Sequence, residues 1–145
     1  MLDRFNANDR GTVLLLFPTS VIVVLVLAAI VLDFGLVHVR TQELRAVAAS
    51  AANDVLGAID IHMLRSTGNI TFDLDVAHSL AETAIATGPL PAASVESVSV
   101  VLDAENRWKI TVTARMRIDY MIAPALPGRK RSLQVAVSES VFVVS

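Results

Sequence analysis

The longest uncharged stretch of this chain constrains its fold more than any other feature. Twenty-one consecutive residues, Thr12 to Leu32, carry no charged side chain. At a rise of about 1.5 Å per residue, a helix of this length reaches about 30 Å, the thickness of the hydrocarbon core of a bilayer. The stretch therefore predicts a single transmembrane helix over residues 12–32. Residues 1–11 are then a cytoplasmic tail, and residues 33–145 form an extracytoplasmic domain.

Three interpretations of this stretch are open: a retained anchor, a cleaved secretory signal and a buried helix of a soluble domain. A secretory signal has an apolar region of roughly 7–15 residues, followed by a small-residue cleavage site. Here the first sites of that kind lie around residues 46–52, well past the end of the run. A buried helix would need cover on all sides, and too little chain remains to supply it. We favour the retained anchor.

Charged residues beside the span give its orientation. Arg10 lies two residues before the span and Arg40 lies eight residues after it. The basic residue nearest the membrane favours the cytoplasmic side, so the N-terminus is expected inside and the C-terminal domain outside. Asp33 follows the span directly and marks the membrane border. In a bundle of such helices it could instead pair with Arg10 or Arg40 of a neighbour.

Pro18 interrupts the backbone hydrogen bonding near the start of the span. It removes one helical N–H and predicts a bend or a looser turn. Thr19 and Ser20 follow it, and their hydroxyls can bond to freed carbonyls. The proline is either a harmless kink or a flexible joint that lets the helix leave the bilayer.

Composition narrows the remaining chain to one small domain. With 145 residues in all, only about one domain follows the span, and aromatic residues make up 5 % of the sequence. Its core must therefore be built from Val, Ile, Leu and Ala. The net charge of −2 provides no basic field for nucleic acid. Cysteine is absent, which excludes disulfides and thiolate metal sites.

The first helix is expected to continue beyond the membrane to about Ile59. Apolar side chains recur there at steps of three and four residues, and they form one face: Leu44, Val47, Ala48, Ala51, Val55 and Ile59. Residues 60–69 look like a polar turn region, and residues 70–74 like a short strand. A second helix is expected from Val76 to about Thr87, with Asp73 or Asp75 as its cap.

The last third of the chain changes to a period of two. Apolar residues alternate with polar ones over 98–102, 109–118 and 133–143. Short or medium connections between these segments predict an antiparallel meander of three or four strands. Its apolar face must be covered by the long helix and the second helix. The predicted fold class is α+β: a long N-terminal transmembrane helix, a second short helix and a small antiparallel sheet.

No group of residues predicts catalysis. His38, His62 and His78 are widely spaced, and no zinc, nucleophile-elbow or phosphate-loop motif occurs. Asp73 and Asp75 look like helix caps and not like a catalytic pair. We therefore expect no enzyme, cofactor, metal, nucleic acid or small-molecule substrate. The one basic cluster, Gly128 to Arg131, is either a solvated loop or a contact to anionic headgroups or an acidic partner.

The N-terminal third resembles a known family. Asp9-Arg10-Gly11 precedes an apolar helix that contains a proline; Leu32-Asp33-Phe34-Gly35 closes it, and an alanine-rich run follows Arg40 and Gln42. This order is similar to the TadE/TadG-like proteins of the bacterial tight-adherence (Flp) pilus, which is related to type II secretion. The later strands are similar to the family's alternating tail.

The resemblance implies a non-enzymatic, pilin-like protein of the bacterial inner membrane that partners lipid and other pilus subunits. Pro18 would give helix flexibility, and Leu44, Val47, Ala48 and Ala51 would pack the helix during assembly. Processed members carry a glutamate five residues after a cleavage glycine. Counted from Gly11, this position is Leu16, so the sequence looks more like the unprocessed members. The alternative is a membrane-tethered module that binds or senses a ligand.

Overall fold

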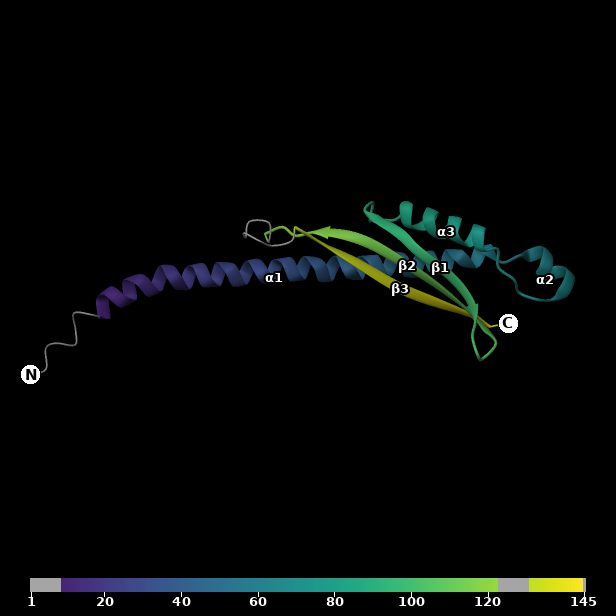
Figure 1. Cartoon of the computed structure of the whole chain (residues 1–145), viewed down its shortest axis with the longest axis horizontal. Helices are drawn as coiled ribbons and strands as arrows, with labels where there is room; N and C mark the ends of the chain where they lie inside the picture. The colour runs from purple at the N-terminus through teal and green to yellow at the C-terminus, as the bar shows by residue number, and fades with distance from the viewer. Residues whose placement is uncertain (1–8, 123–130, 145) are drawn as a thin grey trace, which may run out of the picture. The chain divides into compact units, whose positions relative to one another are not determined.

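The computed structural model describes residues 9–122 and 131–144, with side-chain burial described from residue 16 to 122 and from 131 to 143. Figure 1 shows the order of the elements. It is α1 (Asp9–Asp54), the 3₁₀ turn η1 (Val55–Ala58), α2 (Ile61–Thr67), α3 (Leu74–Ala86), β1 (Ala93–Leu102), β2 (Arg107–Asp119) and β3 (Ser132–Val144). The chain divides into two compact units, Met1–Leu36 with Tyr120–Arg131, and Val37–Asp119 with Ser132–Ser145.

The long first helix is confirmed, with different ends. It was expected over residues 12–59, whereas α1 already includes Asp9 and the α-helical part stops at Asp54. A single 3₁₀ turn containing Gly57 follows, and Ile59 is then extended, with φ −63° and ψ 126°. The weak helix former at position 57 therefore lies in the turn that ends the helix, in keeping with its low propensity.

Residues 60–69 were wrongly predicted as a turn region. They contain α2, whose N-cap Asp60 accepts hydrogen bonds from the backbone N–H groups of His62 and Met63 at 2.9 and 3.0 Å. Gly68 ends the helix in the left-handed region at φ 74°. No residue of α2 is buried, so it shows no apolar period. This helix is defined by its N-cap and its C-terminal glycine and has no packed apolar face.

The short strand expected over residues 70–74 is also wrong. Only an isolated antiparallel bridge forms there, between Ile59 and Phe72. The second apolar helix is confirmed as α3, which starts two residues before the expected Val76. Its cap is Asp73, whose side chain accepts from the N–H groups of Asp75 and Val76 at 3.0 and 3.1 Å.

The period-two segments form the predicted antiparallel meander. It has three strands in the order β1-β2-β3, and β2 pairs with both neighbours along its length. A register shift between Val95 and Ser97 interrupts the β1–β2 pairing. Along β2 every second side chain from Ile110 to Ile118 is buried, as its alternation predicted. The α+β fold class is thus confirmed.

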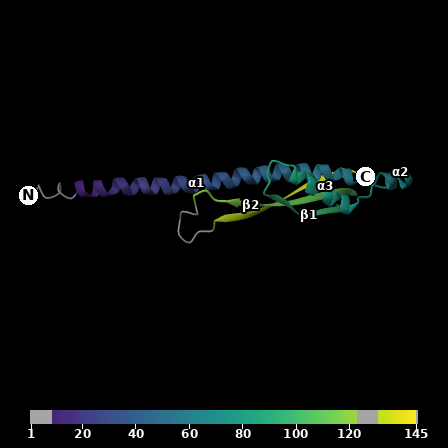
Figure 2. The same ribbon diagram turned by 90° about the horizontal axis from the view of Figure 1, so that it is seen from above.

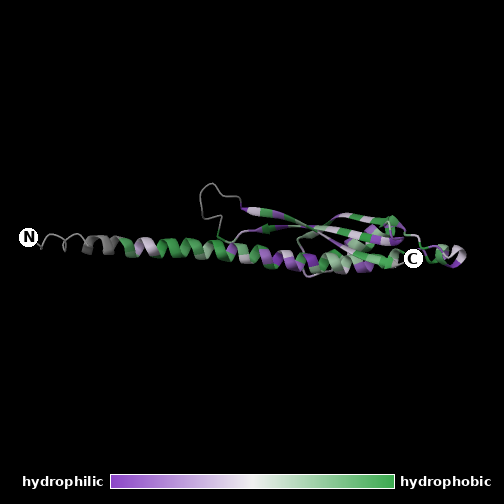
Figure 3. Cartoon of the chain, turned by 90° about the horizontal axis from the view of Figure 1, so that it is seen from below, coloured by the Kyte–Doolittle hydropathy of each residue, from purple (hydrophilic) through white to green (hydrophobic). Residues whose placement is uncertain are grey.

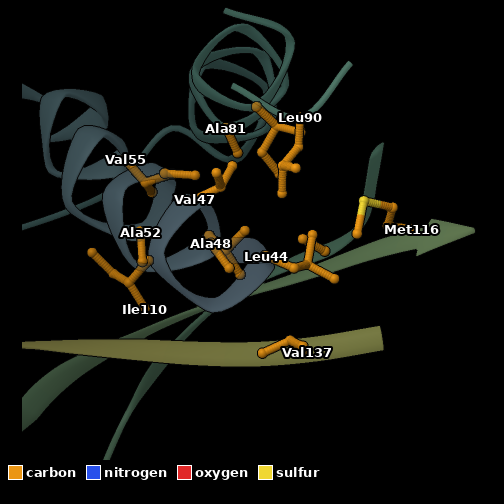
Figure 4. Packing of buried hydrophobic residues seen from close by; sticks show 14 of the residues in the cluster. Leu44, Val47, Ala48, Ala52, Val55, Ala81, Leu90, Ile110, Met116 and Val137 are labelled. Atoms are coloured by element: carbon orange, nitrogen blue, oxygen red, sulfur yellow. The ribbon is translucent and has the colours of Figure 1, made fainter. Parts of the chain in front are cut away.

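Within the second unit, α3 and the last turns of α1 lie on the same side of the sheet (Figure 1 and Figure 2). Figure 4 shows the core between them, with side chains of both helices directed toward β2 and β3. The largest side chains that are fully buried are Leu44 of α1, Val55 of η1, Ile85 of α3, and Ile110 and Val112 of β2. The core is aliphatic, as the scarcity of aromatic residues required.

Candidate functional site

The first part of α1 is an apolar surface that the described residues of the chain leave uncovered. Leu25 and Leu32 are each 63 % exposed, and only 6 % of the most apolar 18-residue window is buried. Figure 3 shows this part of the helix mostly in the hydrophobic colour, with one pale stretch near its start. The interpretation as a helix buried within its own domain is therefore wrong. A membrane anchor and a signal sequence both agree with this exposure.

Pro18 lies inside α1, and the helix continues through it. The ring removes the N–H that would bond to the carbonyl of residue 14. The Ser20 hydroxyl donates to the carbonyl of Phe17 at 2.8 Å. This is not the carbonyl of residue 14, which the proline leaves without its helical N–H, so the expected bond to a freed carbonyl is not the one that Ser20 forms.

Asp33 is the one buried side chain between residues 16 and 43. It is 8 % exposed, whereas its neighbour Phe34 is 73 % exposed. Its Oδ1 accepts hydrogen bonds from the backbone N–H groups of Met121 and Ile122, at 3.0 and 3.2 Å. All three residues belong to the first unit. The carboxylate therefore binds the chain that follows β2 to the helix immediately after its apolar run.

The expected pairing of Asp33 with a basic residue of a neighbouring copy stays a prediction. Within the chain, Arg40 forms an ion pair with Glu43 at 2.8 Å. The backbone partners of Asp33 were missed because they lie 88 and 89 positions away in the sequence. A carboxylate between long apolar runs was the only available signal, and it does not identify a partner.

The four residues assigned to helix packing lie together in the second unit. Leu44, Ala48 and Ala51 are 0 % exposed and Val47 is 7 % exposed. Figure 4 shows Leu44, Val47 and Ala48 facing α3 and the sheet. A Cβ added to Gly88, after α3, would lie 3.4 Å from the Cγ1 of Val47, so the fit leaves little room. These positions pack in the domain's own core, and their role in assembly stays a prediction.

The opposite face of the sheet is largely polar, although Val101 and Phe142 are exposed on it beside Lys109. Two cross-strand hydroxyl pairs lie on it, Thr111 with Ser140 at 2.9 Å and Thr113 with Ser138 at 2.8 Å. The same face carries the exposed cations Lys109, Arg115 and Arg117. Its chemistry suits an acidic or hydrogen-bonding partner.

The turn between β1 and β2 is ordered by one carboxylate. Asp103 accepts from the backbone N–H of Arg107 at 2.8 Å and of Glu105 at 2.9 Å, and from the Arg107 guanidinium at 3.0 Å. The backbone N–H of Arg107 is the largest influence and lowers the pKa of Asp103 below its ordinary value of 3.8. Asn106 completes the turn at φ 59°. The alternating segments predicted a short connection between residues 102 and 109 but not the hydrogen bonds to Asp103.

No candidate for catalysis emerges from the part of the chain that the structure describes. Among those residues, no three His, Asp or Glu side chains lie close enough to hold a metal ion. His38 and His62 are exposed, and His78 lies 3.5 Å from Glu82, an ion pair when the imidazole is protonated. Asp73 is a helix cap, as expected.

Two predicted features fall largely outside the described residues. Of the basic cluster, residues 128–130 lie outside them. Arg131 is exposed, and its carbonyl accepts from the N–H of Tyr120 at 3.0 Å. Gly11 lies in the backbone of α1, before the residues whose burial is described.

The fold and these surfaces together define a pilin-like architecture: a long apolar N-terminal helix and a small domain with an antiparallel sheet. No protein-family model, no curated protein and no solved structure matches the chain. Function must therefore be argued from the architecture itself.

Proposed function

We propose that this protein is a non-enzymatic, membrane-anchored subunit or accessory protein of a Tad-type (Flp) pilus or secretion apparatus. One observation carries the proposal: α1 has two different surroundings along its length. Its first part exposes apolar side chains such as Leu25, while further along Leu44 and Ala48 are fully buried in the domain. A helix built in this way roots a folded domain in a bilayer.

The exposed apolar part is the assembly element of this proposal. In a membrane it is solvated by lipid, and in a filament or assembly complex it would be covered by the equivalent helices of other subunits. Apolar side chains are compatible with both surroundings, so the helix can move between them without exposing charge. Val24 and Leu27 are 62 % and 56 % exposed among the described residues, so the proposal assigns their cover to lipid or to other subunits.

The protein is proposed to stay unprocessed at Gly11. Leu16 occupies the position where processed family members carry a glutamate. A glutamate buried among apolar helices needs a basic partner, and such pairs align subunits axially. With leucine there, that alignment is absent, which fits an assembly component or minor subunit better than a main filament subunit.

Fractionation of the source bacterium tests this function. A tagged full-length copy is expressed, surface filaments are sheared off, and the filaments and washed membranes are probed side by side. Intact mass is recorded for each form. The proposal expects full-length protein in membranes, co-purifying with pilus components. Protein in the sheared fraction without residues 1–11 would make it a processed filament subunit, and protein free of both fractions would contradict the proposal.

A membrane-tethered binding module is the second candidate, favoured by the polar sheet face that carries Lys109, Arg115 and Arg117. In that case the protein remains full length in the membrane but does not co-purify with pilus components. Replacing Arg115 and Arg117 by glutamine then removes its function while leaving its amount unchanged. A pilus accessory whose domain only spaces subunits would tolerate the same two changes.

A further inference from the structure

The segment that follows β2 carries an inference that rests on the proposed membrane anchoring but goes beyond it. We propose that the turn Tyr120–Ile122 is a second membrane contact. It lies at the boundary between lipid headgroups and acyl chains, the Met121 side chain enters the bilayer, and Asp33 is the positioning residue.

Position along the helix is the first argument. The uncharged run from Thr12 to Leu32 is long enough to cross the hydrocarbon core, so Asp33 stands where the helix leaves it. The hydrogen bonds from Met121 and Ile122 to Asp33 hold the turn at this level, within one compact unit. The turn therefore lies at the same depth in the membrane as Asp33.

The backbone of the turn is the second argument. Three consecutive N–H groups are satisfied inside the protein: that of Tyr120 by the carbonyl of Arg131, and those of Met121 and Ile122 by Asp33. Turns in water also form such bonds, as the β1–β2 turn does at Asp103, but water can replace them there. In the water-poor boundary of a bilayer an unsatisfied N–H is costly, so full internal pairing suits this turn to that environment.

Side-chain chemistry is the third argument. Met121 is 76 % exposed, although its backbone is held, and Phe34 beside Asp33 is 73 % exposed. Neither apolar side chain is covered by the residues that the structure describes. Tyr120 is the first residue of the turn, and its N–H donates to the carbonyl of the exposed Arg131. Tyrosine and arginine are residue types that place a polar tip at the headgroups and an apolar body below them. The partner that matches this set is a phospholipid surface.

The depth of Met121 tests the inference directly. The chain has no cysteine, so Met121→Cys carries one environment-sensitive fluorophore in the full-length protein. The protein is reconstituted in phosphatidylethanolamine–phosphatidylglycerol vesicles with spin-labelled lipids of shallow or deep label position. We expect blue-shifted emission and quenching by the shallow label. Val101→Cys, at a position 57 % exposed on the polar sheet face, is the matched control and should show neither.

Variants at Asp33 separate positioning from folding. Asp33→Ala in the Met121→Cys protein should reduce the lipid quenching to the level of the Val101 control. Asp33→Asn keeps a side-chain oxygen that accepts from the N–H groups and should restore most of it. Trp108 fluorescence shows whether each variant keeps its fold. Equal quenching in the alanine variant and the parent would overturn the positioning role.

The membrane anchor and the second membrane contact can be tested separately with fluorophores at two positions. A fluorophore at Val24→Cys reports on the span and should be quenched by the deep label. Quenching at position 24 without quenching at position 121 keeps the anchor and overturns the second contact. Loss of quenching at both positions overturns both. A blue shift at position 121 without lipid quenching means that another copy covers the turn, which also overturns the lipid contact.

Discussion

At the scale of single residues, side-chain size at position 48 decides whether α1 can meet the sheet. Ala48 is fully buried, whereas Ala46, two residues earlier on the same helix, is exposed. Ala48→Glu should lower the free energy of unfolding by at least about 3 kcal/mol, because it overpacks the core and buries an unpaired charge. Ala46→Glu should change it by less than about 0.5 kcal/mol.

Urea unfolding of the full chain in detergent, followed by the fluorescence of Trp108, measures both variants. This tryptophan is the only one in the chain, and it packs edge-on against Phe72 with ring centroids 5.5 Å apart. Equal stability of the two variants would contradict the burial of Ala48. If Ala48→Glu is much less stable than Ala46→Glu, a loss of subunit assembly in the Ala48→Glu variant is a consequence of its unfolding.

Asp103 makes the stability of the β1–β2 turn depend on pH. Folding lowers the pKa of this carboxyl below 3.8, chiefly through the N–H of Arg107. Its stabilisation is therefore complete above about pH 4 and is lost as the pH falls through the folded pKa. We expect wild type to exceed Asp103→Asn in urea midpoint near neutral pH, with the difference shrinking in acid. A difference that does not vary with pH would show that the charge plays no part.

At the scale of elements, the start of α3 depends on a cap. The Asp73 side chain accepts from the N–H groups of Asp75 and Val76. Asp73→Ala should cost about 1 kcal/mol of unfolding free energy, whereas Asp73→Asn should cost almost nothing, since asparagine caps as well as aspartate. The same urea titration measures both. Equal losses in the two variants would mean that the negative charge, and not the cap bond, stabilises the helix.

The elements that sequence predicted are those with a periodic apolar face. Alternation along residues 109–118 gave β2 and its buried side, and three- and four-residue steps gave the packed part of α1 and α3. Local periodicity reports burial directly, so these elements could be read without the structure. The ends of the helices were predicted less accurately. The α-helical part of α1 is followed by a 3₁₀ turn, which the apolar pattern does not indicate.

Elements without a buried face were missed for the same reason. No residue of α2 packs inward, so only Asp60 and Gly68 at its two ends could have indicated it. The bonds of Asp33 to Met121 and Ile122 depend on tertiary placement, which no local pattern contains. The candidate site was thus half predictable: its apolar span was visible in the sequence, and its link to the chain after β2 was not.

At the scale of the whole molecule, one helix serves two environments. Its exposed apolar part agrees with a membrane anchor or a signal sequence, and its buried part completes the core of the domain. Neither part can be exchanged for the other, because the first lacks a polar face and the second has one. The central claim is that the protein is retained in the membrane by residues 12–32, with its domain outside.

Cysteine accessibility in spheroplasts tests that claim most directly, since the native chain has no cysteine. Val24→Cys and Ala46→Cys are each treated with a maleimide that cannot cross a bilayer, and the membrane-pelleted protein is analysed by intact mass. We predict labelling at position 46 in intact spheroplasts and at position 24 only after the membrane is dissolved and the protein denatured. Three outcomes would contradict the account. Position 24 is labelled in intact spheroplasts, position 46 is labelled only after lysis, or a labelled protein that lacks the span is found outside the pellet.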